Sequence, residues 1–250
     1  MRRLVLAVVG MTMLLTAVPG GSAAAAPTEG ARSGSTWAAL LPGEAPLQPG
    51  APMIDRHSSS APYHGSYCTL NFVFEDERAR KVGSRRVRST YIGTSANCTS
   101  TVGQRVEAPQ IGTFGTVVFR DYGYAQFALI RVDPSKLRYV SRVVRGYGAA
   151  PRGYTTSDET SAGDPLLTHG YPMAGTGPSG VTRTGVLVGD TSTGYHSTVQ
   201  PSILDRGSPV ISVRDGKALG ISNEMYYPTG HRTIEGLLGL LEASGLHVTL

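Results

Sequence analysis

Cysteine is scarce in this sequence: Cys68 and Cys98 are the only two among 250 residues. In an exported chain, one cysteine pair most simply forms one disulfide, and the alternative is two free thiols. The histidine and carboxylate side chains show no spacing that is typical of metal ligands. The sequence therefore predicts no metal site and no other cofactor.

Long apolar runs are absent after the first residues. Arg2 and Arg3 precede an apolar run of 15 residues from Leu4 to Val18, and "GGSAAAAP" follows it. This run is too short to span a bilayer, because a transmembrane helix needs about 20 apolar residues. A basic start, a short apolar run and small residues are typical of a secretory signal peptide. We therefore expect a signal peptide over residues 1–26, a secreted protein, and no membrane span in the mature form.

Strong charge of either sign is also missing, since charged residues make up 16% of the chain. Without residues 1–26 the formal net charge falls from +5 to +3, because the rest of the chain has 21 basic and 18 acidic residues. This balance is too mild to predict nucleic-acid binding. The basic segment from Arg78 to Arg88, "RARKVGSRRVR", has two interpretations: a site for an anionic partner, or a solvated hairpin with charged exposed positions. We favour the hairpin.

The mature chain divides by composition into two parts. Residues 27–60 are rich in Gly, Ala, Pro and Ser and have few periodic apolar positions, which is typical of a leader or linker. Residues 61–250 have the texture of one folded domain, and the 40% hydrophobic content of the chain is sufficient for one core.

Short β-branched or aromatic runs separated by turn residues fill most of this domain. Such a pattern argues for an all-β barrel or sandwich. The runs are "YCTLNFVF" (67–74), "RSTYIGT" (88–94), "GTFGTVVFR" (112–120), "AQFALIRV" (125–132), "DPLLTHGYP" (164–172), "VTRTGVLVG" (181–189), "SPVISVR" (208–214) and "ALGISN" (218–223).

One helix is predicted, over about 233–244. Its apolar positions share one face at i, i+3, i+4 and i+7: Ile234, Leu237, Leu238 and Leu241. Thr233 is placed to cap its start and Gly245 to end it.

Three segments together resemble the trypsin- and chymotrypsin-like serine proteases, above all the secreted bacterial ones. "YIGTSANCT", "AQFALIRVD" and "LDRGSPV" stand in the order in which that family has T-A-G-H-C, D-F-A-L-I and G-D-S-G-S-P. The resemblance spans roughly residues 47–244. It implies a chymotrypsin-like double six-stranded β-barrel with a C-terminal α-helix. It also implies that Cys98 pairs with Cys68 in a disulfide.

The three residues that would carry catalysis are missing from these segments. Asn97 stands at the histidine position, Gln126 at the aspartate position and Arg206 at the serine position, at spacings of 29 and 80 residues. The mechanism needs a hydroxyl nucleophile, an imidazole that removes its proton, and a carboxylate that orients the imidazole. An amide is no base near neutral pH, and a guanidinium is no nucleophile. The resemblance therefore implies a protein without this catalytic triad.

Other parts of the loop are kept or altered. Leu204 stands where the family has a glycine that helps to form the oxyanion hole. Asp205 keeps the carboxylate beside the serine position, and we expect an arginine to pair with it, because no "IVGG"-like activation terminus is present. The turn itself is retained in Gly207, Ser208 and Pro209.

Two residues are candidates for binding. Arg206 either captures a carboxylate of a partner or is a polar residue at the floor of the cleft, and we favour the second interpretation. Ser222 marks the strand that would line the cleft, although Asn223 and Glu224 depart from the family pattern.

Function is expected to be binding instead of catalysis. By analogy with the family, the sequence predicts a secreted pseudoprotease: a monomer that binds an extracellular peptide or protein through the inherited cleft. The first alternative is an active hydrolase or peptidase with a rearranged site, in which Ser208 is a displaced nucleophile. The second is a structural or envelope-associated protein.

Overall fold

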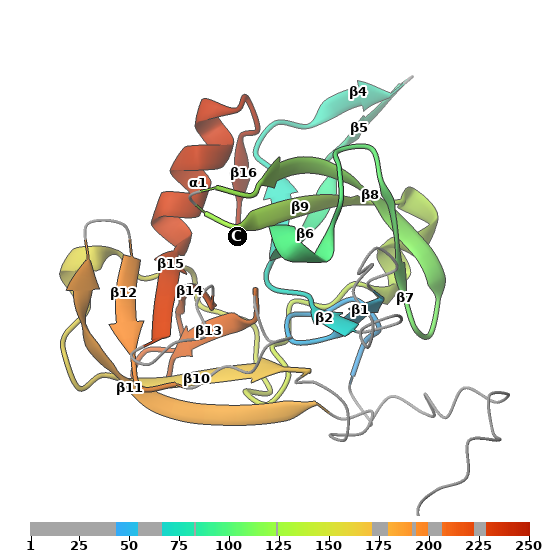
Figure 1. Ribbon diagram of the computed structural model, residues 1–250. Helices are drawn as coiled ribbons and strands as arrows, with labels where there is room; N and C mark the ends of the chain where they lie inside the picture. The colour runs from blue at the N-terminus through green and yellow to red at the C-terminus, as the bar shows by residue number, and fades with distance from the viewer. Residues whose placement is uncertain are drawn as a thin grey trace, which may run out of the picture. The chain divides into compact units, whose positions relative to one another are not determined.

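The described part of the chain consists mainly of short antiparallel strands, as the turn-rich pattern predicts. A computed structural model describes residues 44–54, 67–82, 84–123, 125–171, 180–191, 194–199, 207–222 and 229–250. The strands form two large sheets and one separate hairpin (Figure 1).

The first sheet contains eight strands in the order β16-β3-β6-β9-β8-β7-β1-β2. Its own core includes Met53, Leu70, Ile92, Phe114 and Ile130, all fully buried. The strands are β1 (Pro52–Ile54), β2 (Tyr67–Thr69), β3 (Val73–Asp76), β6 (Thr90–Ser95), β7 (Arg105–Ala108), β8 (Gly112–Asp121), β9 (Phe127–Val132) and β16 (Val248–Thr249).

This sheet has two more strands than the six expected, and its strands come from a wider stretch of the chain. Residues 44–54, which the composition assigns to the leader, contribute β1 to the sheet. Leu47, Ala51 and Met53 are fully buried, and the Leu47 N–H donates to the Tyr139 carbonyl at 3.1 Å. This part of the predicted leader therefore belongs to the folded domain.

The second sheet is a closed barrel of six strands, as expected. Its interior contains Leu166, Leu187, Tyr195, Val210 and Leu219. The strand order around the barrel is β10 (Pro165–Gly170), β11 (Val181–Thr191), β12 (Gly194–Ser197), β15 (Thr229–Thr233), β14 (Ala218–Ser222) and β13 (Pro209–Ser212).

One apolar cluster joins the two sheets and the helix α1 (Ile234–Ala243). It brings Phe127 of β9 together with Ile211 of β13 and with Leu237 and Leu241 of α1. The Thr233 hydroxyl caps the helix by accepting from the Gly236 N–H at 3.0 Å. The predicted helix and its cap are therefore confirmed. Among the described residues, no helix has the length and apolarity that crossing a membrane requires.

The basic segment forms a separate two-stranded sheet of β4 (Arg80–Val82) and β5 (Arg85–Val87). Lys81, Arg86 and Arg88 are exposed. The segment therefore has the predicted hairpin structure with charged exposed positions. Three short 3₁₀ helices complete the described elements: η1 (Ala96–Cys98), η2 (Pro134–Tyr139) and η3 (Ser157–Glu159).

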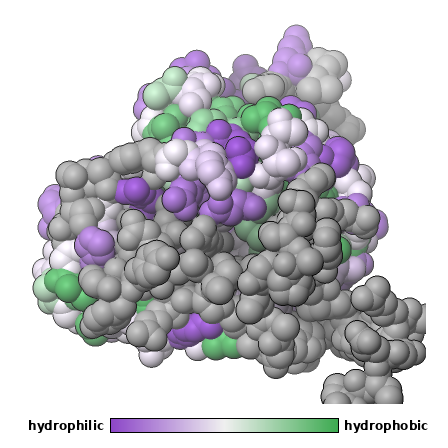
Figure 2. Space-filling model, in the orientation of Figure 1, coloured by the Kyte–Doolittle hydropathy of each residue, from purple (hydrophilic) through white to green (hydrophobic). Residues whose placement is uncertain are grey.

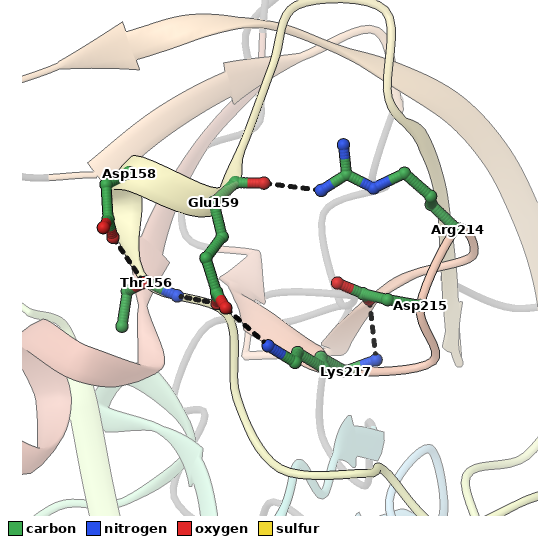
Figure 3. A network of polar contacts seen from close by, with 6 residues as sticks. All are labelled: Thr156, Asp158, Glu159, Arg214, Asp215 and Lys217. Carbon is green, nitrogen blue, oxygen red and sulfur yellow. Dashed lines mark hydrogen bonds and ion pairs between the residues drawn. The ribbon is translucent and has the colours of Figure 1, made fainter.

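A polar network fastens the η3 loop to the turn between β13 and β14 (Figure 3). The Lys217 ammonium contacts the Glu159 carboxylate at 2.7 Å, and Arg214 donates to the Glu159 carbonyl. Arg214 also pairs with Asp164 at 3.0 Å. Exposed ion pairs contribute little stability each, so the network mainly fixes the position of the turn. On the face shown in Figure 2, hydrophilic and hydrophobic residues are interleaved over the described part.

Candidate functional site

Asn97 lies in η1, directly after β6. The Ser95 hydroxyl caps this 3₁₀ turn by accepting from the Asn97 N–H at 3.2 Å. A disulfide joins Cys98 to Cys68 on β2, which confirms the predicted pair. Ala96 and Cys98 are buried on either side of Asn97, whereas Asn97 itself is half-buried. The turn therefore leaves the Asn97 side chain within reach of a ligand.

Gln126 lies immediately before β9 and has an unusual backbone. Its φ of +48° makes it the one non-glycine residue with a positive φ in the described part of the chain. The Asp121 carboxylate closes the preceding loop by accepting from the Gly123 N–H at 3.2 Å and from the Ala125 N–H. The Ala96 N–H then donates to the Gln126 carbonyl at 2.9 Å. These bonds hold Gln126 in a conformation that non-glycine residues rarely adopt.

The two side chains meet although 29 residues separate them. Asn97 Nδ2 lies 3.5 Å from Gln126 Oε1, the long limit of a hydrogen bond. Neither amide accepts a proton near neutral pH. Among the described residues, no further side-chain bond engages Asn97 Oδ1 or Gln126 Nε2. The pair therefore offers a ligand one acceptor and one donor.

Gly207 brings the end of the "LDRGSPV" loop against this turn. It has a φ of +84°, and a Cβ at this position would lie 2.4 Å from the Ser95 backbone nitrogen. The Gly207 N–H donates to the Ser222 carbonyl at 2.6 Å, and the Ser222 N–H donates to the Ser208 carbonyl at 3.0 Å. Pro209 follows as the first residue of β13. Only glycine satisfies both the backbone conformation and the close approach.

The serines of this region are buried. Ser208 and Ser222 are each 0% exposed. Ser222 was a binding candidate, but it contributes backbone bonds to the loop and presents no exposed side chain here. Three other predicted positions, Leu204, Asp205 and Arg206, lie outside the described residues.

Arg120 and Tyr122 are part of this region and were not singled out from the sequence. Arg120 Nε donates to the carbonyls of Ala96 at 3.2 Å and Thr99 at 3.0 Å. Its guanidinium carbon lies 4.7 Å from the centre of the Tyr122 ring, and Tyr122 is 60% exposed. The only sequence signal is Arg-x-Tyr at the end of a strand, since alternate residues of a strand share a face.

A second polar group ties residues 44–50 to the rest of the domain. Arg145, whose side chain is 1% exposed, pairs with Glu44 at 3.3 Å and donates to the Tyr171 hydroxyl. Burial of the phenol raises the pKa of Tyr171 to about 12, although the neighbouring Arg145 opposes the shift. His169 Nδ1 lies 2.8 Å from the Thr182 hydroxyl in the same region. Because His169 is buried, this contact is structural and offers no accessible base.

Metal binding finds no support in the described residues, where no three His, Cys, Asp or Glu side chains gather at one point.

The fold is similar to that of solved serine proteases. A glutamic-acid-specific serine protease, in which a histidine triad takes part in substrate binding, matches with a TM-score of 0.51 and 16% identity, over 82% of this chain and 100% of that one. A chymotrypsin from Cellulomonas bogoriensis matches with a TM-score of 0.49 and 14% identity, over 82% of this chain and 98% of that one. An alpha-lytic protease homologue, N4, has a TM-score of 0.47 and 18% identity, over 81% and 98% of the two chains.

These matches are structural only. No family model matches the sequence, and no curated protein matches it. At 16% identity, the first match shows the fold and nothing further about activity. The chain therefore has the chymotrypsin-like double-barrel fold, and the expected resemblance to the trypsin- and chymotrypsin-like proteases is confirmed at that level.

Proposed function

We propose that this protein is a secreted, catalytically inactive homologue of the serine proteases that binds an extracellular peptide or protein. The observation that carries the proposal is the contact between Asn97 and Gln126. Two neutral amides face each other where the catalytic mechanism needs an imidazole and a carboxylate. The backbone that would position a catalytic pair is present, but its proton-transfer chemistry is not.

Peptide binding suits the groups that the site offers. A peptide presents N–H donors and C=O acceptors, and Asn97 Oδ1 and Gln126 Nε2 are an acceptor and a donor of matching kind. Both residues are half-buried, so a ligand bond made there would be shielded in part from water. The disulfide is compatible with export, because such bonds persist mainly in oxidising compartments.

The competing proposal, a hydrolase with a rearranged site, has Ser208 as its candidate nucleophile. Ser208 is 0% exposed, and its carbonyl accepts from the Ser222 N–H within the barrel. A nucleophile must reach the substrate carbonyl, so this burial argues against a displaced serine.

A fluorophosphonate probe tests the loss of activity. We expect no stoichiometric labelling of the purified mature protein. Among the residues that the structure describes at this site, none is a base that could activate a hydroxyl. The matched control is Ser208→Ala. Stoichiometric labelling of the wild type that disappears in Ser208→Ala would show a working nucleophile and overturn the proposal.

Binding is tested by NMR on isotope-labelled protein with a mixture of random hexapeptides. We expect the side-chain amide signals of Asn97 and Gln126 to shift as the mixture is added. The side chain of Gln104 is half-buried and accepts a hydrogen bond from the Ser100 hydroxyl, and its signal serves as the reference. Asn97 and Gln126 signals that do not move at any concentration would contradict binding at this site. Recovery of the protein from culture medium, beginning near residues 24–27, tests export separately.

A further inference from the structure

Arg120 is held at the edge of the Asn97–Gln126 pair by its Nε alone. Nε donates to the carbonyls of Ala96 and Thr99, at 3.2 and 3.0 Å. The N–H of the same Ala96 donates to the Gln126 carbonyl, so one residue connects the guanidinium to the amide pair. The guanidinium is planar, and fixing Nε therefore also limits the directions of its two terminal nitrogens.

The Tyr122 ring packs beside this guanidinium. The Arg120 guanidinium carbon lies 4.7 Å from the ring centre, and the ring is largely exposed. Asp121, between them, belongs to the opposite side of the strand, and its carboxylate already accepts from the N–H groups of Gly123 and Ala125. Asp121 is the nearest acid in the sequence, and its described hydrogen bonds go to the loop backbone and not to Arg120.

Both hydrogen bonds of the Arg120 side chain use Nε, and its two terminal nitrogens have no acceptor among the described residues. Several other arginines of the domain are satisfied by a carboxylate. These pairs are Arg105 with Asp133, Arg142 with Glu75, Arg145 with Glu44 and Arg214 with Asp164.

We propose that Nη1 and Nη2 of Arg120 bind a carboxylate of the peptide that occupies the Asn97–Gln126 site, with Tyr122 alongside. The inference rests on the proposed function and names the chemistry of its ligand. A guanidinium whose Nε is occupied still presents two parallel N–H donors, the arrangement that fits the two oxygens of a carboxylate. Because Gln126 is neutral, the site holds no carboxylate of its own at that position to repel a second one.

Matched peptides test the proposal on the full-length mature protein. Three alanine pentapeptides are titrated while the side-chain signals of Arg120, Asn97 and Gln126 are followed by NMR. The first has a central glutamate and blocked ends, the second a central glutamine and blocked ends, and the third a central glutamine and a free C-terminal carboxylate. We expect a roughly tenfold lower Kd for at least one carboxylate peptide than for the blocked glutamine peptide. Which of the two binds more tightly distinguishes a side-chain carboxylate from a chain terminus.

Two variants and a control locate the effect. In Arg120→Gln the preference for a carboxylate should disappear, and in Tyr122→Ala, which removes an exposed ring, it should fall by severalfold. Arg131→Gln removes the same charge from an exposed position of β9 and should keep the preference. The comparison of peptides on the wild type remains decisive if Arg120→Gln fails to fold.

The outcomes distinguish failure of the carboxylate site from failure of peptide binding as a whole. Equal Kd values for all three peptides, with shifts at Asn97 and Gln126, would overturn the carboxylate site and leave the proposed function standing. A preference that survives Arg120→Gln would also overturn it. If no peptide moves the signals of Asn97 and Gln126, both the carboxylate site and peptide binding at the amide pair fail.

Discussion

At the scale of single residues, backbone bonds determine where the Asn97 and Gln126 side chains lie. Ser95 caps the turn that carries Asn97, and the Gln126 carbonyl accepts from the Ala96 N–H. What such a pair can do depends on the atoms at the end of each side chain. An amide nitrogen has no lone pair available to take a proton, whereas an imidazole nitrogen has one. The two amides can therefore donate and accept hydrogen bonds, but they cannot take up a proton near neutral pH.

Gly207 provides the residue-scale prediction. We expect Gly207→Ala to lower the free energy of unfolding by about 3 kcal/mol or more, through a strained φ plus a clash with the Ser95 nitrogen. Gly103→Ala is the matched control, because Gly103 has a similar φ of +90° but no atom within 4 Å of a new Cβ. That change should cost only about 1 kcal/mol. Urea unfolding of both variants measures the difference, and equal losses would show that the contact with Ser95 is not tight.

At the scale of elements, the segment 44–54 adds a strand and a buried ion pair to the first sheet. Arg145 and Glu44 join this segment to the chain between the two sheets, and Arg145 N–H donates to the Pro49 carbonyl at 3.0 Å. Gly50 is packed against Arg145 and His169, where a Cβ would lie 3.0 Å from the Arg145 Cβ. The segment is therefore an integral element of the domain.

The ion pair gives the element-scale prediction. Glu44→Gln should lower the free energy of unfolding by about 2 kcal/mol, because it leaves the buried Arg145 without its counter-charge. The loss is smaller than for a fully buried pair, because Glu44 is partly exposed to water. Glu75→Gln is the control, since Glu75 pairs with Arg142 at an exposed position. That variant should lose less than about 1 kcal/mol. Thermal or urea unfolding of the two variants compares them, and a Glu44→Gln protein as stable as the control would contradict a structural role for the pair.

At the scale of the whole molecule, one apolar cluster is shared by both sheets and by α1. If either sheet separated from this cluster, the apolar side chains that the other sheet contributes would be exposed to water. We therefore regard the described domain as one cooperative unit, in which a change of protonation at one buried group affects the stability of all of it.

The pH dependence of stability follows from the buried tyrosines. The pKa of Tyr171 is raised to about 12, so between pH 10 and 12 the unfolded chain has lost this proton while the folded protein keeps it. Stability present below pH 10 should therefore fall as the pH rises toward 12. Burial also raises the pKa of Tyr195, which adds to the loss.

Tyr171→Phe should flatten this alkaline loss by up to about 2 kcal/mol, although the variant starts less stable because Arg145 loses an acceptor. Tyr154→Phe removes the hydroxyl of an exposed tyrosine and is the matched control. Free energies of unfolding measured from pH 8 to 12 test both variants. A slope in Tyr171→Phe identical to that of the wild type would show that this phenol does not titrate in the assigned window.

The sequence predicted those parts of the molecule that local patterns determine. The turn-rich runs indicated a β protein, and the apolar spacing from Ile234 to Leu241 located the helix with its Thr233 cap. The order of three segments in the chain also predicted that Asn97 lies near Gln126. Asn97 follows β6 and Gln126 precedes β9, and these two strands pair antiparallel with Ser95 opposite Phe127.

Other parts depend on distant contacts that leave no local pattern. Residues 44–54 are rich in proline, glycine and alanine, so their composition does not predict burial, although the family resemblance begins near residue 47. A strand of two residues such as β16 has too few positions to show alternation. Arg120 and Tyr122 were identified only from their contacts in the structure. An Arg-x-Tyr sequence at the end of a strand does not predict which carbonyls the arginine reaches.

The pairing of β16 with β3 bears on the order in which the protein matures. Val248 pairs with Asp76, so the first sheet includes residues from near both ends of the described chain. During synthesis, β3 leaves the ribosome long before β16 does, and its outer edge stays unpaired until β16 is made. All strands of the second barrel precede β16 in the chain. We infer that the sheet begun first is completed last, and that chaperones would meet this open edge in the meantime.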